Sequence, residues 1–177
     1  MSHPTLFDSR RMFEYGCAFA DCAKACEIEP NHIEYRMHSH TVSGIVNSAF
    51  ACEIFLKTLL IFHGVPQEIL RGEKGKNGRK GHDLSYLWEK YKEFDMETTL
   101  NIEQAMQAWF NSQNEKMFDK MLSEAYNAFE HWRYIYEKDS AKINLHFLRG
   151  FRNILRDICC KRIHGKTWEE YIKSPLE

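Results

Sequence analysis

The chain has 177 residues, which is enough for one domain with a substantial buried core. Its 24 basic and 25 acidic residues give a formal net charge of −1, so affinity for a polyanion would have to come from a local patch. Hydrophobic residues make up 44% and charged residues 28% of the chain, a composition that is typical of globular proteins and excludes a disordered, low-complexity chain.

Cellular location is indicated by hydropathy and by cysteine content. The longest apolar run, Ile54 to Phe62, is interrupted by Lys57 and Thr58, and falls short of the roughly 18 residues that a membrane-spanning helix needs. The first eleven residues lack a hydrophobic signal region. We therefore expect a cytoplasmic protein with no membrane partner, whose six cysteines are free thiols: Cys17, Cys22, Cys26, Cys52, Cys159 and Cys160.

Apolar residues recur at helical spacing along most of the chain. The pattern predicts helices at 6–27, 32–63, 84–94, 99–110, 114–136 and 143–163, with a short turn at 168–172. Pro30 separates the first two helices, Gly64 ends the second, and Gly165 ends the last long one. Asp83 is the expected N-cap of the helix that follows it.

These elements predict the fold class. The second half of helix 32–63 is apolar on more than one face, as expected of a central helix. The sequence shows neither an alternating strand pattern nor an internal repeat. We expect a single all-α domain over 1–177, an antiparallel four-helix-type bundle with short additional helices.

The segment RGEKGKNGRKG, at 71–81, is the clearest loop. It has five basic residues and one acidic residue, but lacks the Gly-Lys-Ser/Thr ending of a nucleotide-binding P-loop. One interpretation is a flexible surface loop with no specific ligand. The other is that the loop and the helix start at His82-Asp83 hold a phosphate, with contacts from Lys74, Lys76, Arg79 and Lys80.

Three segments in a fixed order carry a resemblance to a known family. They are NSAFACEIFLKTLLIFHG (47–64), GHDLSYLWEKY (81–91) after the basic loop, and HWRYIYE (131–137). Over roughly residues 40–165 this order resembles the HEPN domain family. The resemblance implies an all-α bundle, often a homodimer, that binds or acts on RNA or nucleotides, in many members as part of a toxin–antitoxin pair or of phage defence.

The catalytic members of that family are metal-independent ribonucleases. They use an arginine, a polar residue and a histidine that follows after four to six intervening residues in the last core helix. Arg152-Asn153 matches the first half of this motif, but Asp157, Ile158 and Cys159 occupy the three positions for the histidine. An aspartate, with a reference pKa of about 3.9, is a poor general acid at neutral pH. This departure favours a binding module over a ribonuclease.

Two other polar groups are candidates for a site. Glu53 and Lys57 have the i, i+4 spacing of an ion pair, which either fixes the packing of the bundle or lines a polar pocket together with Arg133 or Arg152. In HWRYIYE, Arg133 beside aromatic rings suits a phosphate and a stacked base. It suits a buried ion pair equally well, and the binding candidates there are Arg133, Tyr134 and Glu137.

Metal and cofactor sites are not indicated. Cys22 and Cys26 lack the C-x2-C spacing of zinc sites and are flanked by alanines, so we interpret them as small core residues. Three functions remain open: a module that binds RNA, a nucleotide or a cognate protein; a ribonuclease in which His82 or His131 acts beside Arg133 or Arg152; and a structural dimerisation domain.

Overall fold

The structure is a computed structural model that describes residues 8–27, 40–72, 80–135 and 143–174. These ranges form helices joined by short connections, and their only β pairing is an isolated bridge between Gly72 and Lys80. The all-α prediction is confirmed for this part of the chain. The helices are α1 (Ser9–Cys26), α2 (Thr41–Phe62), α3 (Gln67–Leu70), α4 (Leu84–Phe94), α5 (Met96–Phe110), α6 (Met117–Ala125), α7 (Ala128–Arg133), α8 (Leu145–His164) and α9 (Trp168–Lys173).

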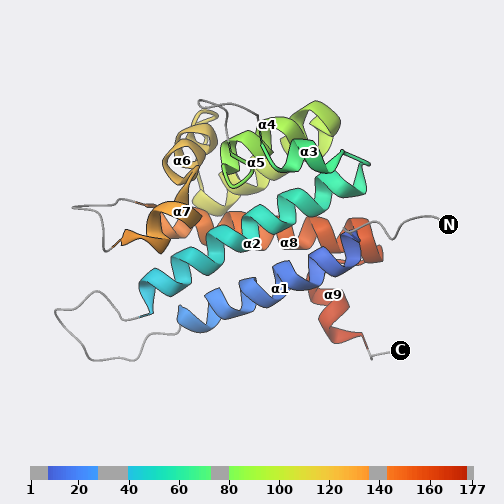
Figure 1. Cartoon of the computed structure of the whole chain (residues 1–177), viewed down its shortest axis with the longest axis horizontal. Helices are drawn as coiled ribbons and strands as arrows, with labels where there is room; N and C mark the ends of the chain where they lie inside the picture. Colours follow the sequence, from blue (N-terminus) through green and yellow to red (C-terminus); the bar gives the residue numbers. More distant parts are fainter. Residues whose placement is uncertain (1–7, 28–39, 73–79, 136–142, 175–177) are drawn as a thin grey trace.

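Helix α2 is the central helix, as the sequence predicts. It packs against α1, α4, α7 and α8, while α3 to α6 lie on the side of α2 opposite α1 (Figure 1). Because it has neighbours on several sides, it buries residues on several faces, which explains its lack of a single apolar stripe. Close packing with α1 depends on Gly16, where a Cβ would lie 2.5 Å from the ring of Phe55.

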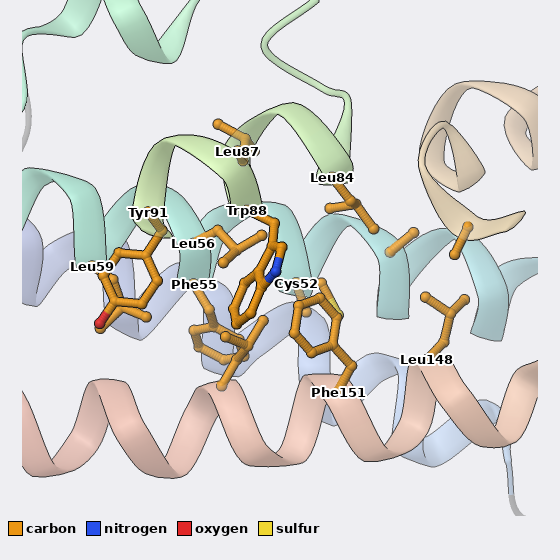
Figure 2. Packing of buried hydrophobic residues seen from close by; sticks show 14 of the residues in the cluster. Cys52, Phe55, Leu56, Leu59, Leu84, Leu87, Trp88, Tyr91, Leu148 and Phe151 are labelled. Carbon is orange, nitrogen blue, oxygen red and sulfur yellow. The ribbon is translucent and has the colours of Figure 1, made fainter. Parts of the chain in front are cut away.

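The core between α2, α4 and α8 is largely aromatic. Trp88 and Tyr91 of α4 point toward α2 and α8, and the ring centroid of Trp88 lies 5.8 Å from that of Phe151 (Figure 2). Phe55 lies on the α2 side of the same cluster, and all four side chains are at most 1% exposed. Full burial of a side chain such as Phe55 contributes about 1.5–3 kcal/mol to stability.

Helix ends follow local signals. Asp83 is the N-cap of α4, because its carboxylate accepts a hydrogen bond of 2.9 Å from the Tyr86 N–H. Gly64 and Gly165, with φ of 75° and 69°, adopt the left-handed conformation that follows the ends of α2 and α8. The predicted boundaries of α4 are correct, and those of α8 are within two residues.

One predicted helix is wrong. The segment predicted as a single helix, 114–136, contains two helices, α6 and α7, with a break at Tyr126 and Asn127. The break places the Tyr126 carbonyl where it accepts a hydrogen bond of 2.8 Å from the Leu84 N–H. That N–H is at the start of α4 and has no partner within its own helix. The break between α6 and α7 thus coincides with a contact to a distant segment, and the spacing of apolar residues gives no sign of that contact.

The membrane expectation needs one qualification. Of the described helices, α2 is long and apolar enough to cross a membrane by length and composition, with a mean hydropathy of 1.7 over its most apolar window. In the folded chain 61% of that window is buried. A buried core helix passes the same test, so this property does not by itself place α2 in a membrane.

Candidate functional site

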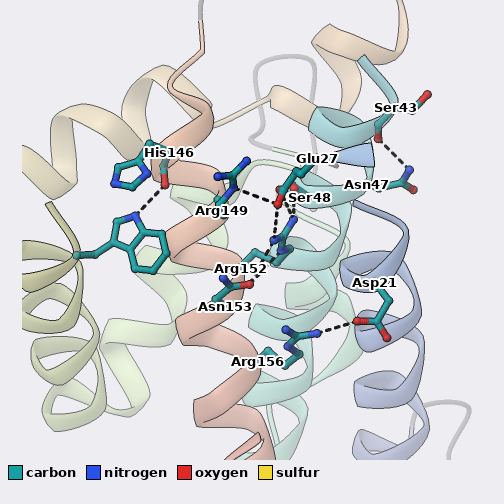
Figure 3. Close-up of polar contacts among 11 residues, drawn as sticks. Asp21, Glu27, Ser43, Asn47, Ser48, His146, Arg149, Arg152, Asn153 and Arg156 are labelled. Atoms are coloured by element: carbon teal, nitrogen blue, oxygen red, sulfur yellow. Dashed lines mark hydrogen bonds and ion pairs between the residues drawn. The ribbon is translucent and has the colours of Figure 1, made fainter. Parts of the chain in front are cut away.

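The predicted site residues fall into two separate clusters. The first is a seam between α8 and α1, which contains Arg152 (Figure 3). Arg152 is 1% exposed, and its Nη1 donates hydrogen bonds of 2.8 Å to Glu27 and to Ser48. Its Nε and Nη2 donate to Oδ1 of Asn153 at 3.3 Å, and Nη2 also reaches Glu27 at 3.5 Å. A guanidinium has five N–H donors, so these five contacts occupy all of them.

Neighbouring arginines of α8 strengthen the same seam. Nε of Arg149 lies 3.0 Å from Glu27, and Nη1 of Arg156 donates a hydrogen bond of 3.0 Å to Asp21. The Arg156 guanidinium also lies over the Trp168 ring, 4.4 Å from its centroid. The spacing of 149, 152 and 156 places the three side chains on one face of the helix. The seam therefore joins the two helices by ion pairs, and Arg152 has no donor left for a substrate.

The second cluster is centred on Glu53 of α2, which is 2% exposed. Its carboxylate accepts a hydrogen bond of 2.7 Å from Lys57, which confirms the predicted i, i+4 ion pair. It also lies 2.9 and 3.0 Å from Nδ1 of His82, which immediately precedes the N-cap of α4. The proposed partners Arg133 and Arg152 are thus replaced by an imidazole that the sequence did not suggest.

The pair of Glu53 and His82 fixes the orientation of the imidazole. An ionised carboxylate only accepts hydrogen bonds, so Nδ1 carries the proton that points to Glu53. In the neutral ring, Nε2 on the other edge is then an acceptor. The His82 side chain is 46% exposed, whereas that of Glu53 is 3% exposed. A buried acid therefore holds a histidine that a ligand can reach.

Aromatic residues connect His82 to α7. The His82 ring lies 5.7 Å from that of Phe129, and the Arg133 guanidinium lies 5.9 Å from the same ring. Arg133 also lies 5.4 Å from the ring of Tyr134, and both residues are exposed. Behind Phe129, Phe50 of α2 stacks on it with centroids 4.6 Å apart. We call His82, Phe129, Arg133 and Tyr134, with Lys80, the His82 face.

Lys80 ties the end of the basic loop to this face. Its Nζ lies 3.1 Å from the Glu130 carboxylate on α7, with the lysine side chain 69% exposed. The bridge between Gly72 and Lys80 brings together the two described ends of the loop. The other binding candidates of this loop, Lys74, Lys76 and Arg79, lie outside the described residues, as does Glu137.

The remaining catalytic candidates occupy other positions. His131 is half-buried on α7, two residues from Phe129, so it points to a different side of that helix. Asn153 lines an open groove between α5 and α8. Sequence analysis missed Phe129, Phe50 and Glu27, because a lone phenylalanine or glutamate at helical spacing gives no signal of a site.

The four buried cysteines are unsuited to nucleophilic chemistry. Cys22 is exposed and Cys26 is partly exposed, so the prediction that both are small core residues is wrong for Cys22. Burial raises the pKa of Cys17 and of Cys52 to about 12 and that of Cys160 to about 11, so these groups are thiols at neutral pH. Cys159 is also buried, and its pKa is raised in the same direction. Across 8–27, 40–72, 80–135 and 143–174, no group of three or more His, Cys, Asp or Glu side chains gathers as metal ligands.

Comparisons with known proteins give no match to a family model, to a curated protein or to a solved structure. The resemblance to the HEPN family therefore stays a prediction.

Proposed function

We propose that this chain is a HEPN-like helical module that binds single-stranded RNA through the His82 face. In this proposal the long helices form the antiparallel four-helix-type bundle of that family. The protein works in the cytoplasm as a homodimer beside a cognate partner of a toxin–antitoxin or phage-defence system. The observation that carries the RNA proposal is the contact of the exposed Arg133 guanidinium with both the Phe129 and the Tyr134 ring.

The chemistry of this face favours RNA over a partner without phosphates. Single-stranded RNA is bound by cations that contact phosphates and by aromatic side chains on which bases stack. Arg133 and Lys80 supply the cations, and Tyr134, which is 41% exposed, supplies an accessible ring. Lys80, the first described residue after the loop, is tied to α7 through Glu130 while its side chain stays 69% exposed.

The test is fluorescence anisotropy with a labelled single-stranded RNA of mixed sequence, over a range of salt concentrations. Arg133→Gln should weaken binding and reduce the slope of log K against log salt by about one, as expected for one lost phosphate contact. Tyr134→Ala should weaken binding by about 1–3 kcal/mol for a stacked base while the salt slope is retained. Lys120→Gln, at an exposed position of α6, is the matched control. Equal affinity of all four proteins would rule out this face.

A ribonuclease is the second candidate, because Glu53 orients His82. In that reaction Nε2 of His82 takes the proton of a ribose 2′-OH, whose oxygen attacks the adjacent phosphorus. The 5′-oxygen leaves and takes up a proton from water, which gives a 2′,3′-cyclic phosphate and a 5′-hydroxyl. Arg133 would stabilise the charge on the phosphate oxygens.

Cleavage of mixed RNA in the presence of EDTA tests this candidate. Activity that is lost in His82→Asn and kept in Lys120→Gln would support it. Activity that is kept in His82→Asn but lost in an Arg152→Ala protein that circular dichroism shows to be folded would instead place the reaction at the seam. RNA that stays intact with the wild-type chain would remove the ribonuclease and leave the binding proposal standing.

A further inference from the structure

A groove between α5 and α8 is made by helices that take no part in the His82 face. It is open to solvent and has a volume of about 730 Å³, within the range of ligand-binding pockets. The helices are antiparallel there, since Arg162 at the end of α8 donates a hydrogen bond of 2.6 Å to Thr98 at the start of α5. The groove is lined by Thr98, Asn101, Ala105, Asn153, Ile154, Asp157, Ile158, Lys161 and Arg162.

Two carboxamides lie on opposite walls of the groove. Oδ1 of Asn153 accepts two hydrogen bonds from Arg152, and only the oxygen of an amide can accept from a guanidinium. Its NH2 group is therefore left to donate to a ligand. Asn101, exposed on α5, offers both a donor and an acceptor. Paired carboxamides of this kind suit the N–H and C=O groups of a peptide backbone.

The rest of the lining divides into an aliphatic part and a cationic end. Ile154 and Ile158 are half-buried and lie one helical turn apart. Lys161 and Arg162 follow, paired with Asp157 and Asp95 at 2.8 Å, with side chains that are 49% and 41% exposed. The Lys161–Asp157 pair, with side chains 49% and 34% exposed, contributes little, about 0–1 kcal/mol, so a ligand carboxylate can compete for Lys161.

We infer that this groove binds a short, extended peptide in which an aliphatic and an acidic side chain lie two positions apart. The distance along the α8 axis from the midpoint of Ile154 and Ile158 to the midpoint of Lys161 and Arg162 is about 8 Å, at 1.5 Å per residue. Residues i and i+2 of an extended strand point to the same side and lie about 6.7 Å apart, which matches this separation. The groove lining contains no aromatic ring, so it lacks the stacking surface on which nucleic acid bases are held.

The experiment uses the full chain and a displayed library of random heptapeptides. Selection should enrich peptides in which Leu, Ile or Val lies two positions from Glu or Asp, in one consistent order. Their affinity, measured by fluorescence anisotropy, should fall at least about fivefold for Asn101→Leu, for Lys161→Gln, and for a peptide in which glutamine replaces the acid. Lys173→Gln, which removes an equivalent i, i+4 ion pair on α9, should leave affinity unchanged.

Enriched peptides without the acid, or peptides that bind Asn101→Leu and Lys161→Gln as tightly as the wild type, would overturn the proposal, as would a selection that enriches nothing. Circular dichroism shows whether each variant is folded. If one is not, the proposal is decided by comparing the acidic peptide with its Glu-to-Gln version on the wild-type chain. Arg133→Gln should retain peptide affinity, so failure here and failure of RNA binding are separate results.

Discussion

The seam between α8 and α1 and the contacts behind the His82 face each bury one charged side chain where helices pack, yet they differ in whether its partners are accessible. In the seam the cation is buried, and all five donors of Arg152 are satisfied by protein oxygens. Behind the His82 face the acid, Glu53, is buried, and it holds Lys57 and His82, whose side chains are 17% and 46% exposed. A buried charged side chain whose partners are also largely buried stabilises the fold. A buried charged side chain with an exposed partner can also hold that partner in position for a ligand.

The largest expected effect comes from breaking the seam. Arg152→Met should destabilise the folded state by about 3–5 kcal/mol, because it removes all five hydrogen bonds of a buried guanidinium: Ser48 loses this donor, and Glu27 keeps only its contact with the more exposed Arg149. Urea denaturation monitored by circular dichroism measures this. Arg149→Met removes a contact to the same carboxylate from a side chain that is 44% exposed, and should cost less than about 1 kcal/mol. Equal costs for both variants would contradict the contrast drawn between buried and exposed arginines.

Glu53, which is buried behind the His82 face, should matter more for stability than the more exposed His82. Glu53→Gln keeps the shape of the side chain but weakens its bonds to Lys57 and His82, and should cost about 1–3 kcal/mol. His82→Asn should cost less than about 1 kcal/mol, because the imidazole is half exposed. Thermal unfolding of the two variants checks this order. A larger loss for His82→Asn would mean that the imidazole holds α4 in place rather than facing a ligand.

Sequence patterns predicted the helices well where the signal is local. The spacing of apolar residues and the cap at Asp83 gave both ends of α4, and Glu53 and Lys57 were paired by their spacing alone. Long-range contacts were not predictable in this way. Glu27, which lies 125 positions from Arg152, has no feature that marks it as the partner. Nor does helical spacing show that the carbonyl of Tyr126 is needed by a distant helix start.

The start of α4 allows the His82 face to be disturbed without removing any of its side chains. Asp83→Ala removes the hydrogen bond to the Tyr86 N–H and should destabilise the protein by about 1 kcal/mol. Because the cap follows His82 directly, fraying of this turn should also lower RNA affinity. Thr167→Ala removes the equivalent cap of α9, far along the chain from the face, and is the matched control. Chemical denaturation and anisotropy on both variants separate a local effect from a general loss of stability.

The smallest effect is expected at the exposed end of α8, where Arg162 contrasts with the buried Arg152. Burial raises the pKa of Asp95. Hydrogen bonds from the Thr98 N–H and hydroxyl, together with the charge of Arg162, lower it by more, so the pKa of Asp95 lies below its ordinary value. The unfolded chain then binds a proton more readily than the folded one as pH falls below about 4. Asp95 therefore contributes stability that is present above that pH and is lost in acid.

Asp95→Asn should flatten the fall in stability below pH 4, measured by urea denaturation at successive pH values, and Arg162→Gln should flatten it partly. A steeper fall in Arg162→Gln would show that Arg162 does not favour the ionised form of Asp95.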